Sequence, residues 1–143
     1  FSSDFIIGYP GETEKDFSDT LDLLEKIRFV NSFSFIFSPR PGTTAAKLET
    51  IDYEIAKKRL ILIQKKLFNN QIELNKSMEG KKIEVLVENK IAKQNKLFGR
   101  NKYLSSVIFN GEEKNIGNLV NVQINNSNQN TLFGEIEKNM KAA

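Results

Sequence analysis

The spacing of hydrophobic residues changes near the middle of the chain. In residues 1–78, short apolar runs alternate with stretches in which apolar residues recur every three or four positions, as in strands followed by helices. From Gly80 onward, apolar and polar residues alternate in short segments separated by turn residues, which predicts β-strands. The pattern therefore predicts an α/β segment followed by a small all-β segment, with the boundary near Met78–Gly80.

The first segment is predicted to be a parallel βαβ unit. A strand at residues 5–7, buried on both faces, precedes a helix that begins after Thr13, and a second strand covers residues 33–37. Both strands end in turns rich in glycine and proline, which should lie at the same edge of the sheet. Because α/β folds bind ligands at the carboxyl ends of their strands, this edge of a βα barrel or doubly wound sheet is a candidate site.

Two helix starts carry capping signals. Thr13 and Asp16 form a T-x-x-D capping box, and Asp52 can cap a long helix from Tyr53 to about Lys76.

In the second half, the strands are expected to bend at Gly99 and to turn at the Asn-Gly pair of residues 110–111, which is a strong hairpin signal. Those strands predict a β-barrel of roughly 60 residues.

The amino-acid composition excludes several kinds of chemical site. The chain of 143 residues contains no cysteine and no histidine, which excludes disulfides, zinc held by those residues and a histidine base within it. The net charge of +3 lies entirely after residue 76, which slightly favours an anionic partner. Because the sequence has neither an apolar run long enough to span a membrane nor a signal-peptide pattern at its start, we expect a cytoplasmic protein with no membrane contact. Because it starts with Phe1 at the edge of a strand, we expect it to be the C-terminal portion of a longer protein.

The order of motifs resembles a known family. The stretch "DFIIGYPGET", then "FSFIFSPRPGTTAA", a long helix, and a basic barrel containing "LFGR", "VIFNG", "IGNLVNVQI" and "TLFGEI" is similar to the C-terminal half of radical S-adenosylmethionine tRNA methylthiotransferases. The resemblance covers essentially the whole chain, although Asp4 departs from the G-x-I-x-G-x-x-G-E pattern and Thr44 stands where the family often has proline. It implies that residues 1–78 end a radical-SAM βα barrel with its closing helix, and that residues 79–143 form a TRAM-like, OB-like RNA-binding barrel.

The resemblance also implies a binding site for S-adenosylmethionine. Its expected residues are Ile6, Ile7, Gly8, Gly11, Glu12, Phe35, Phe37, Ser38 and Arg40. Alternatives remain open: the glycines may form an ordinary tight turn, Glu12 may stabilise a helix dipole or clamp the site, and Arg40 may be solvated. The family's C-x-x-x-C-x-x-C loop for a [4Fe–4S] cluster is absent, so we expect no catalytic or metal-binding residue here and no activity from this chain alone.

A second expected site lies in the barrel. Basic and aromatic residues that could contact RNA are Lys81, Lys82, Lys96, Phe98, Arg100, Lys102 and Tyr103. Cations contact phosphates and exposed rings stack on unpaired bases, whereas the alternative has Phe98 in the core and the cations merely solvated.

The resemblance implies a function for the longer protein. It is expected to methylthiolate an adenosine next to the tRNA anticodon, using S-adenosylmethionine, [4Fe–4S] clusters, and sulfur and electron donors. Related branches act on threonylcarbamoyladenosine in tRNA or on a ribosomal protein, and "SPRPGT" fits the tRNA branches better. A stand-alone RNA-binding module is the alternative from another functional class.

Overall fold

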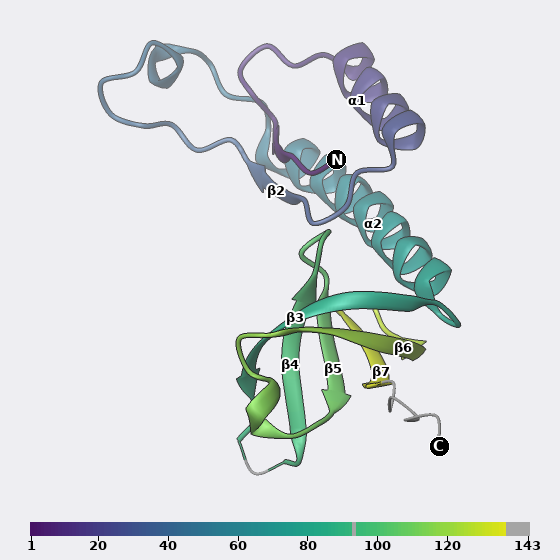
Figure 1. The fold of residues 1–143 in the computed structure, drawn as a ribbon. Helices are drawn as coiled ribbons and strands as arrows, with labels where there is room; N and C mark the ends of the chain where they lie inside the picture. Colours follow the sequence, from purple (N-terminus) through teal and green to yellow (C-terminus); the bar gives the residue numbers. More distant parts are fainter. Residues whose placement is uncertain (93, 137–143) are drawn as a thin grey trace, which may run out of the picture. The chain divides into compact units, whose positions relative to one another are not determined.

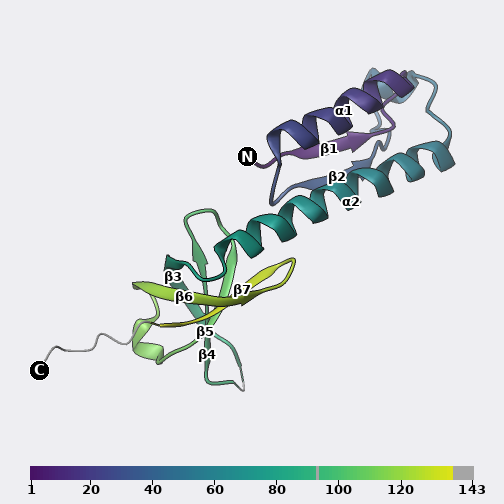
Figure 2. The same cartoon turned by 90° about the vertical axis from the view of Figure 1, so that its right-hand side faces the viewer.

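The structure is a computed structural model that describes residues 1–92 and 94–136. Its chain divides into two compact units, residues 1–71 and a second unit that begins at Ile72. Figures 1 and 2 show the elements of each unit, coloured along the sequence.

The first unit contains one parallel pair of strands. Its elements are β1 (Asp4–Ile7), α1 (Glu14–Ile27), β2 (Phe33–Ile36), the short 3-10 helix η1 (Ala45–Lys47), and the part of α2 (Tyr53–Met78) up to residue 71. The strands β1 and β2 pair in parallel, from Asp4 opposite Phe33 to Ile7 opposite Ile36, and α1 connects them. The predicted βαβ unit is confirmed, and within the described residues it forms this pair rather than a closed βα barrel.

The helix starts follow the predicted capping signals. The Thr13 hydroxyl accepts a hydrogen bond from the Asp16 amide, and the Asp16 carboxylate accepts one from the Thr13 amide, which completes the capping box. Hydrogen bonds to the Thr13 hydroxyl and, to a smaller extent, to the Thr13 amide hold the pKa of Asp16 below its ordinary value. At α2, the Asp52 carboxylate accepts hydrogen bonds from the amides of Glu54 and Ile55. Each cap satisfies amides that have no partner within the helix.

One face of the two-stranded sheet packs on the helices. The core of this unit consists of Phe5, Ile7, Phe17, Leu24, Ile63 and Leu67. The prediction that β1 is buried on both faces is wrong here, because alternate residues point away from this core and Ile6 is 58% exposed. The opposite face of β2 is also uncovered, with Phe33 and Phe35 exposed. Only one helical layer covers the pair in the described structure, so only one side chain in two is buried.

The second unit is a closed five-stranded barrel. Its strands are β3 (Lys82–Lys90), β4 (Lys96–Asn101), β5 (Ser106–Asn110), β6 (Leu119–Ser127) and β7 (Thr131–Ile136), with the 3-10 helix η2 (Glu113–Asn115) before β6. The order around the barrel is β3-β4-β5-β7-β6, in which β5 and β7 pair in parallel and all other neighbours pair antiparallel. The predicted small barrel is confirmed.

Inward-pointing residues fill the barrel. The core contains Met78, Val85, Val87, Leu97, Val107, Phe109, Val122, Ile124 and Leu132. Apart from Met78, these are the apolar residues of the alternating pattern, so each strand presents one face to the core and the other to the surface. Met78 is the last residue of α2, so this helix also contributes a side chain to the barrel core.

Two turn predictions need correction. The Asn110-Gly111 pair does not join two paired strands: β5 ends there, and β6 pairs with β3 and β7 instead. The strand β5 instead forms a hairpin with the preceding strand β4, and in the turn between them the Asn101 side chain accepts hydrogen bonds from the amides of Tyr103 and Ser105. Gly99 is not a bend, because it lies within β4 and allows β3 to approach closely.

Candidate functional site

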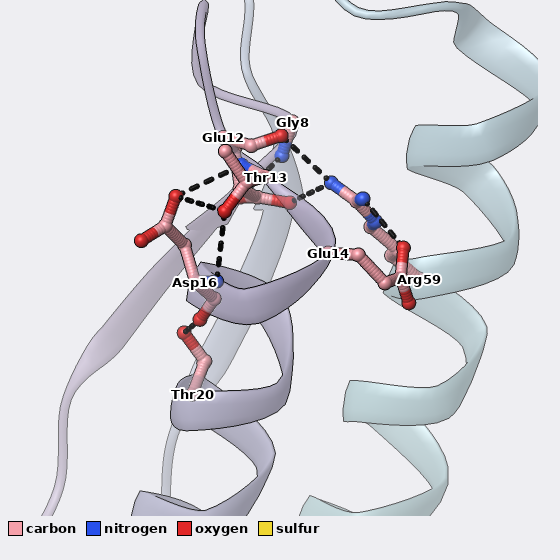
Figure 3. A network of polar contacts seen from close by, with 7 residues as sticks. All are labelled: Gly8, Glu12, Thr13, Glu14, Asp16, Thr20 and Arg59. Atoms are coloured by element: carbon pink, nitrogen blue, oxygen red, sulfur yellow. Dashed lines mark hydrogen bonds and ion pairs between the residues drawn. The ribbon is translucent and has the colours of Figure 1, made fainter.

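The turn between β1 and α1 has a defined conformation. Gly8 and Gly11 have φ values of 75° and 88°, which favour glycine, and the Glu12 amide donates a hydrogen bond to the Tyr9 carbonyl at 2.9 Å. The Gly8 amide donates to the Glu12 carboxylate at 2.9 Å (Figure 3). A Cβ at Gly8 would lie 2.8 Å from the Ala56 Cβ, so α2 packs directly against the turn. The turn is closed on itself and held against α2.

Arg59 of α2 fixes the other side of this turn. Its Nη1 lies 2.7 Å from a Glu12 carboxylate oxygen and 3.2 Å from the Glu12 carbonyl oxygen, and its Nη2 lies 2.8 Å from a Glu14 carboxylate oxygen (Figure 3). The guanidinium also lies 5.2 Å from the centre of the Phe17 ring. Arg59 is only 7% exposed, and within the described structure its Nε has no hydrogen-bond partner.

The electrostatics of Arg59 favour the charged form. Burial alone would lower the pKa of the guanidinium, but the hydrogen bonds to Glu14 and Glu12 outweigh it and raise the pKa above its ordinary value. Both carboxylate oxygens of Glu12 are engaged, one by the Gly8 amide and one by Arg59. Glu12 is therefore a clamp that ties the glycine turn to α2.

Sequence reasoning did not identify Arg59. One signal was present: Arg59 lies three residues after Ala56 and four before Ile63, both of which are buried on the same face of α2. A cation at a core position requires a buried acidic partner, and a glutamate that follows a glycine turn is a suitable candidate.

The other residues of the expected cofactor site fall into two groups. Ile6 and Phe35 are opposite each other in the register of β1 and β2, so their exposed side chains share the uncovered face. Ile7 differs, because its side chain is 2% exposed in the opposite core and cannot line a ligand on that face. Its carbonyl accepts a hydrogen bond from the Phe37 amide at 2.8 Å.

The turn after β2 contains the rest of the expected cofactor residues. The Phe37 ring packs edge-on against Tyr9, with the ring centres 5.1 Å apart, which joins this turn to the one after β1. Ser38 and Arg40 are exposed beyond it, and the Arg40 carbonyl accepts hydrogen bonds from the amide and hydroxyl of Thr43. The two turns therefore lie at one edge of the pair, as the sequence predicts.

The expected RNA-binding residues are also divided by the structure. Lys96, Phe98 and Arg100 alternate along β4 and share its outer face, with the Arg100 guanidinium 5.5 Å from the centre of the Phe98 ring. Phe98 is half-buried and outside the barrel core, so the alternative that placed it in the core does not hold. Arg100 also lies 3.5 Å from the Glu88 carboxylate.

The remaining cations lie on other parts of the barrel. Lys102 and Tyr103 are in the turn between β4 and β5, where the Lys102 ammonium lies 5.0 Å from the centre of the Tyr103 ring. Lys81 lies directly before β3 and Lys82 is its first residue, where this strand pairs with β6 and not with β4. The structure thus brings together the residues of β4 and separates Lys81 and Lys82 from them.

Two kinds of feature are absent from the described residues. Residues 1–92 and 94–136 contain no cluster of three acidic, histidine or cysteine side chains arranged to hold a metal ion. None of the helices in those ranges is both long and apolar enough to cross a membrane.

Comparisons with known proteins cover both units. The TRAM domain model matches residues 76–136. Over 141 residues, the chain is 60% identical to the tRNA-2-methylthio-N(6)-dimethylallyladenosine synthase of Pelagibacter ubique, a match that covers 99% of this chain and 32% of the relative. Proteins with the same name from Vesicomyosocius okutanii and Wolbachia pipientis are 48% and 44% identical, over 94% of this chain and 31% of each relative.

These matches have a consistent extent. The chain spans about a third of the length of the relatives, and it aligns with their C-terminal part. The similarity includes both the parallel strand pair with its glycine turn and the barrel. Over nearly its whole length the chain is therefore similar to the C-terminal part of these tRNA-2-methylthio-N(6)-dimethylallyladenosine synthases, and its residues 76–136 match the TRAM domain.

Proposed function

We propose that this chain serves as the C-terminal part of an enzyme that methylthiolates an adenosine next to the tRNA anticodon. The observation that carries this proposal is the 60% identity to a relative with that named product, which extends over 99% of the chain and both units. In this proposal, residues 1–78 complete a radical-SAM βα barrel, and residues 79–143 hold the tRNA. The names of the relatives favour this substrate over threonylcarbamoyladenosine or a ribosomal protein, and the identity across the first unit favours it over a stand-alone RNA-binding module.

The first unit fits a role in binding S-adenosylmethionine. An apolar strand face with Ile6 and Phe35 exposed lies beside a glycine turn that Glu12 and Arg59 hold in one conformation. The apolar face offers a seat for the adenine ring, and the Gly8 turn allows close approach to backbone groups. When bound, the cofactor supplies the methyl group and the radical of this reaction class.

The iron–sulfur cluster is assigned to other parts of such an enzyme. Its ligands in this family are cysteines, and this chain has none. The chain's residues therefore position the cofactor and the RNA, and residues 1–143 alone do not cleave S-adenosylmethionine. Sulfur and electron donors act on the complete enzyme.

Replacing Lys96, Arg100 and Lys102 together with alanine is expected to weaken the binding of an anticodon stem–loop RNA. Each phosphate contact that is lost should reduce the slope of log affinity against log salt concentration by about 0.7–0.9. Fluorescence anisotropy of labelled RNA over a salt series measures both quantities.

A matched control keeps the change in charge but moves it to α2. Lys57, Lys58 and Lys65 are exposed there, and their joint replacement by alanine should leave the salt slope close to that of the unchanged protein. An unchanged slope in a folded Lys96/Arg100/Lys102 variant would move the RNA contact to another face, with Lys81–Lys82 as the next candidate.

In the complete enzyme, Gly8→Val is expected to weaken binding of S-adenosylmethionine by about 5- to 150-fold and to leave tRNA affinity nearly unchanged. The valine would adopt φ near 75° and collide with Ala56, which costs roughly 1–3 kcal/mol in the turn. Isothermal titration with the cofactor measures the change. Gly80→Val is the control, because Gly80 has φ of 76° with open space around it. Loss of tRNA affinity with intact cofactor affinity would contradict the assignment.

A further inference from the structure

The barrel contains the same hairpin twice. The sequence Leu-Phe-Gly occurs at residues 97–99 in β4 and at residues 132–134 in β7. Each of these strands pairs antiparallel with the long strand before it, β3 or β6. In both hairpins the register shifts at the same step, between the partner of the glycine and the partner of the phenylalanine.

The surroundings of the two glycines match almost atom for atom. A Cβ added at Gly99 would overlap the Leu86 carbonyl oxygen and lie 2.7 Å from a Val85 methyl group. A Cβ added at Gly134 would overlap the Gln123 carbonyl oxygen and lie 2.7 Å from a Val122 methyl group. The two hairpins therefore have matching positions: Phe98 with Phe133, Arg100 with Glu135, and Lys96 with Thr131.

The strand β5 lies between the two copies and joins them into one surface. Ile108 is opposite Phe98 in the pairing of β4 with β5, and opposite Phe133 in the pairing of β5 with β7. All three are half-buried, whereas the preceding residues Leu97, Val107 and Leu132 are fully buried in the core. Phe98, Ile108 and Phe133 thus form a row on the outer surface of the barrel, which we call the outer row.

The outer row has opposite charges at its two ends. At the β4 end, Lys96 and Arg100 flank Phe98, and the Arg100 guanidinium stacks near its ring. At the β7 end, the exposed Glu135 occupies the position that corresponds to Arg100. The two rings are separated by two strand spacings, about 10 Å.

We propose that the outer row is a stacking platform for two unpaired bases of an RNA strand. Phe98 and Phe133 each stack one base, Ile108 supports the span between them, and Lys96 and Arg100 contact phosphate at the β4 end only. Aromatic rings beside cations are the combination that binds single-stranded nucleic acid, because rings accept any base and cations attract the backbone. The proposal rests on the proposed RNA-binding role of the barrel and names the surface and the unpaired state of its ligand.

Conservative replacements of the two rings test the proposal. Phe98→Leu and Phe133→Leu keep an apolar side chain on the outer row but remove the stacking surface. Each should weaken binding of an anticodon stem–loop by roughly 5- to 150-fold and leave binding of a fully paired RNA duplex unchanged. Anisotropy titrations with the 143-residue chain measure both, and circular dichroism confirms that the variants are folded. Leu119→Ala is the control, because Leu119 is 62% exposed on β6, away from the outer row.

A second variant tests the same surface by a gain of affinity. Glu135→Arg places at the β7 end the residue that the equivalent position of β4 already has. It should tighten stem–loop binding and steepen the salt dependence by about one phosphate contact.

The outcomes separate this inference from the function on which it rests. If the unchanged chain does not bind the stem–loop, the proposed RNA-binding role fails and the platform with it. If it binds with a normal salt slope but Phe133→Leu and Glu135→Arg behave like Leu119→Ala, the RNA-binding role stands and the outer row is overturned. Equal losses on the stem–loop and the duplex would also overturn it, because a duplex offers no unpaired base to stack.

Discussion

Replacing Arg59 with methionine is expected to destabilise the first unit by about 3–5 kcal/mol. Methionine retains the apolar stem against Phe17 but leaves the Glu12 carboxylate, whose side chain is 13% exposed, without its cationic partner. The loss should appear as faster amide hydrogen exchange in α1 and the glycine turn, and as an earlier transition in urea. Because the chain has two units, the exchange data are needed to assign the transition to the first of them.

The control for Arg59→Met is Lys66→Met. Lys66 pairs with Glu25 at 2.7 Å, but the two side chains are 32% and 64% exposed, so losing this pair should cost less than about 1 kcal/mol. The double variant Arg59→Met with Glu12→Gln should lose less than the sum of the single variants, because the buried charge is gone. If Arg59→Met is as stable as Lys66→Met, Arg59 does not clamp the turn.

Alanine at Gly99 or at Gly134 is expected to destabilise the barrel by more than about 3 kcal/mol, beyond the usual range for overpacking. The added methyl group would overlap a backbone carbonyl oxygen, which no change of rotamer can relieve. Since the two hairpins match, the two variants should lose similar stability, measured as free energies of unfolding by circular dichroism.

Gly117→Ala provides the comparison for these two variants. Gly117 has φ of 84° with nothing within 4 Å of an added Cβ, so alanine there should cost only the strain of a left-handed conformation, about 1–2 kcal/mol. If Gly99→Ala or Gly134→Ala is no worse than Gly117→Ala, the close approach of the strands is not required for the barrel.

The barrel strands could be predicted from the sequence, but their partners could not, whereas the parallel pairing of β1 with β2 could. Alternation of apolar residues located the barrel strands because one face of each must be buried. The Asn110-Gly111 signal failed because turn propensity is local, whereas β5 takes its partners from β4 and from the distant β7. Periodicity likewise cannot show that only one face of β1 is covered, because that depends on which elements surround the strand.

The glycine turn of the candidate cofactor site could be predicted from the sequence, but the contacts that hold this turn in place could not. Glycine spacing located the turn at Gly8 and Gly11, since few other residues adopt positive φ. The role of Arg59 could not be predicted, because a cation in a lysine-rich helix normally faces solvent. The burial of Arg59 depends on how α2 packs against the turn. The match between Phe98 and Phe133 was present in the repeated Leu-Phe-Gly, but the pairing of both with Ile108 needed the structure.

The position of β7 between β5 and β6 determines when the barrel can finish folding. Until β7 joins, β5 and β6 each have an open edge with unpaired amides and carbonyls, the kind of edge that recruits other chains. The pairing of β5 with β7 is parallel and distant in sequence, which makes it slow to form. During translation, the two edges stay open until Thr131–Ile136 has left the ribosome, so the partly made barrel is most prone to aggregation just before its last strand emerges.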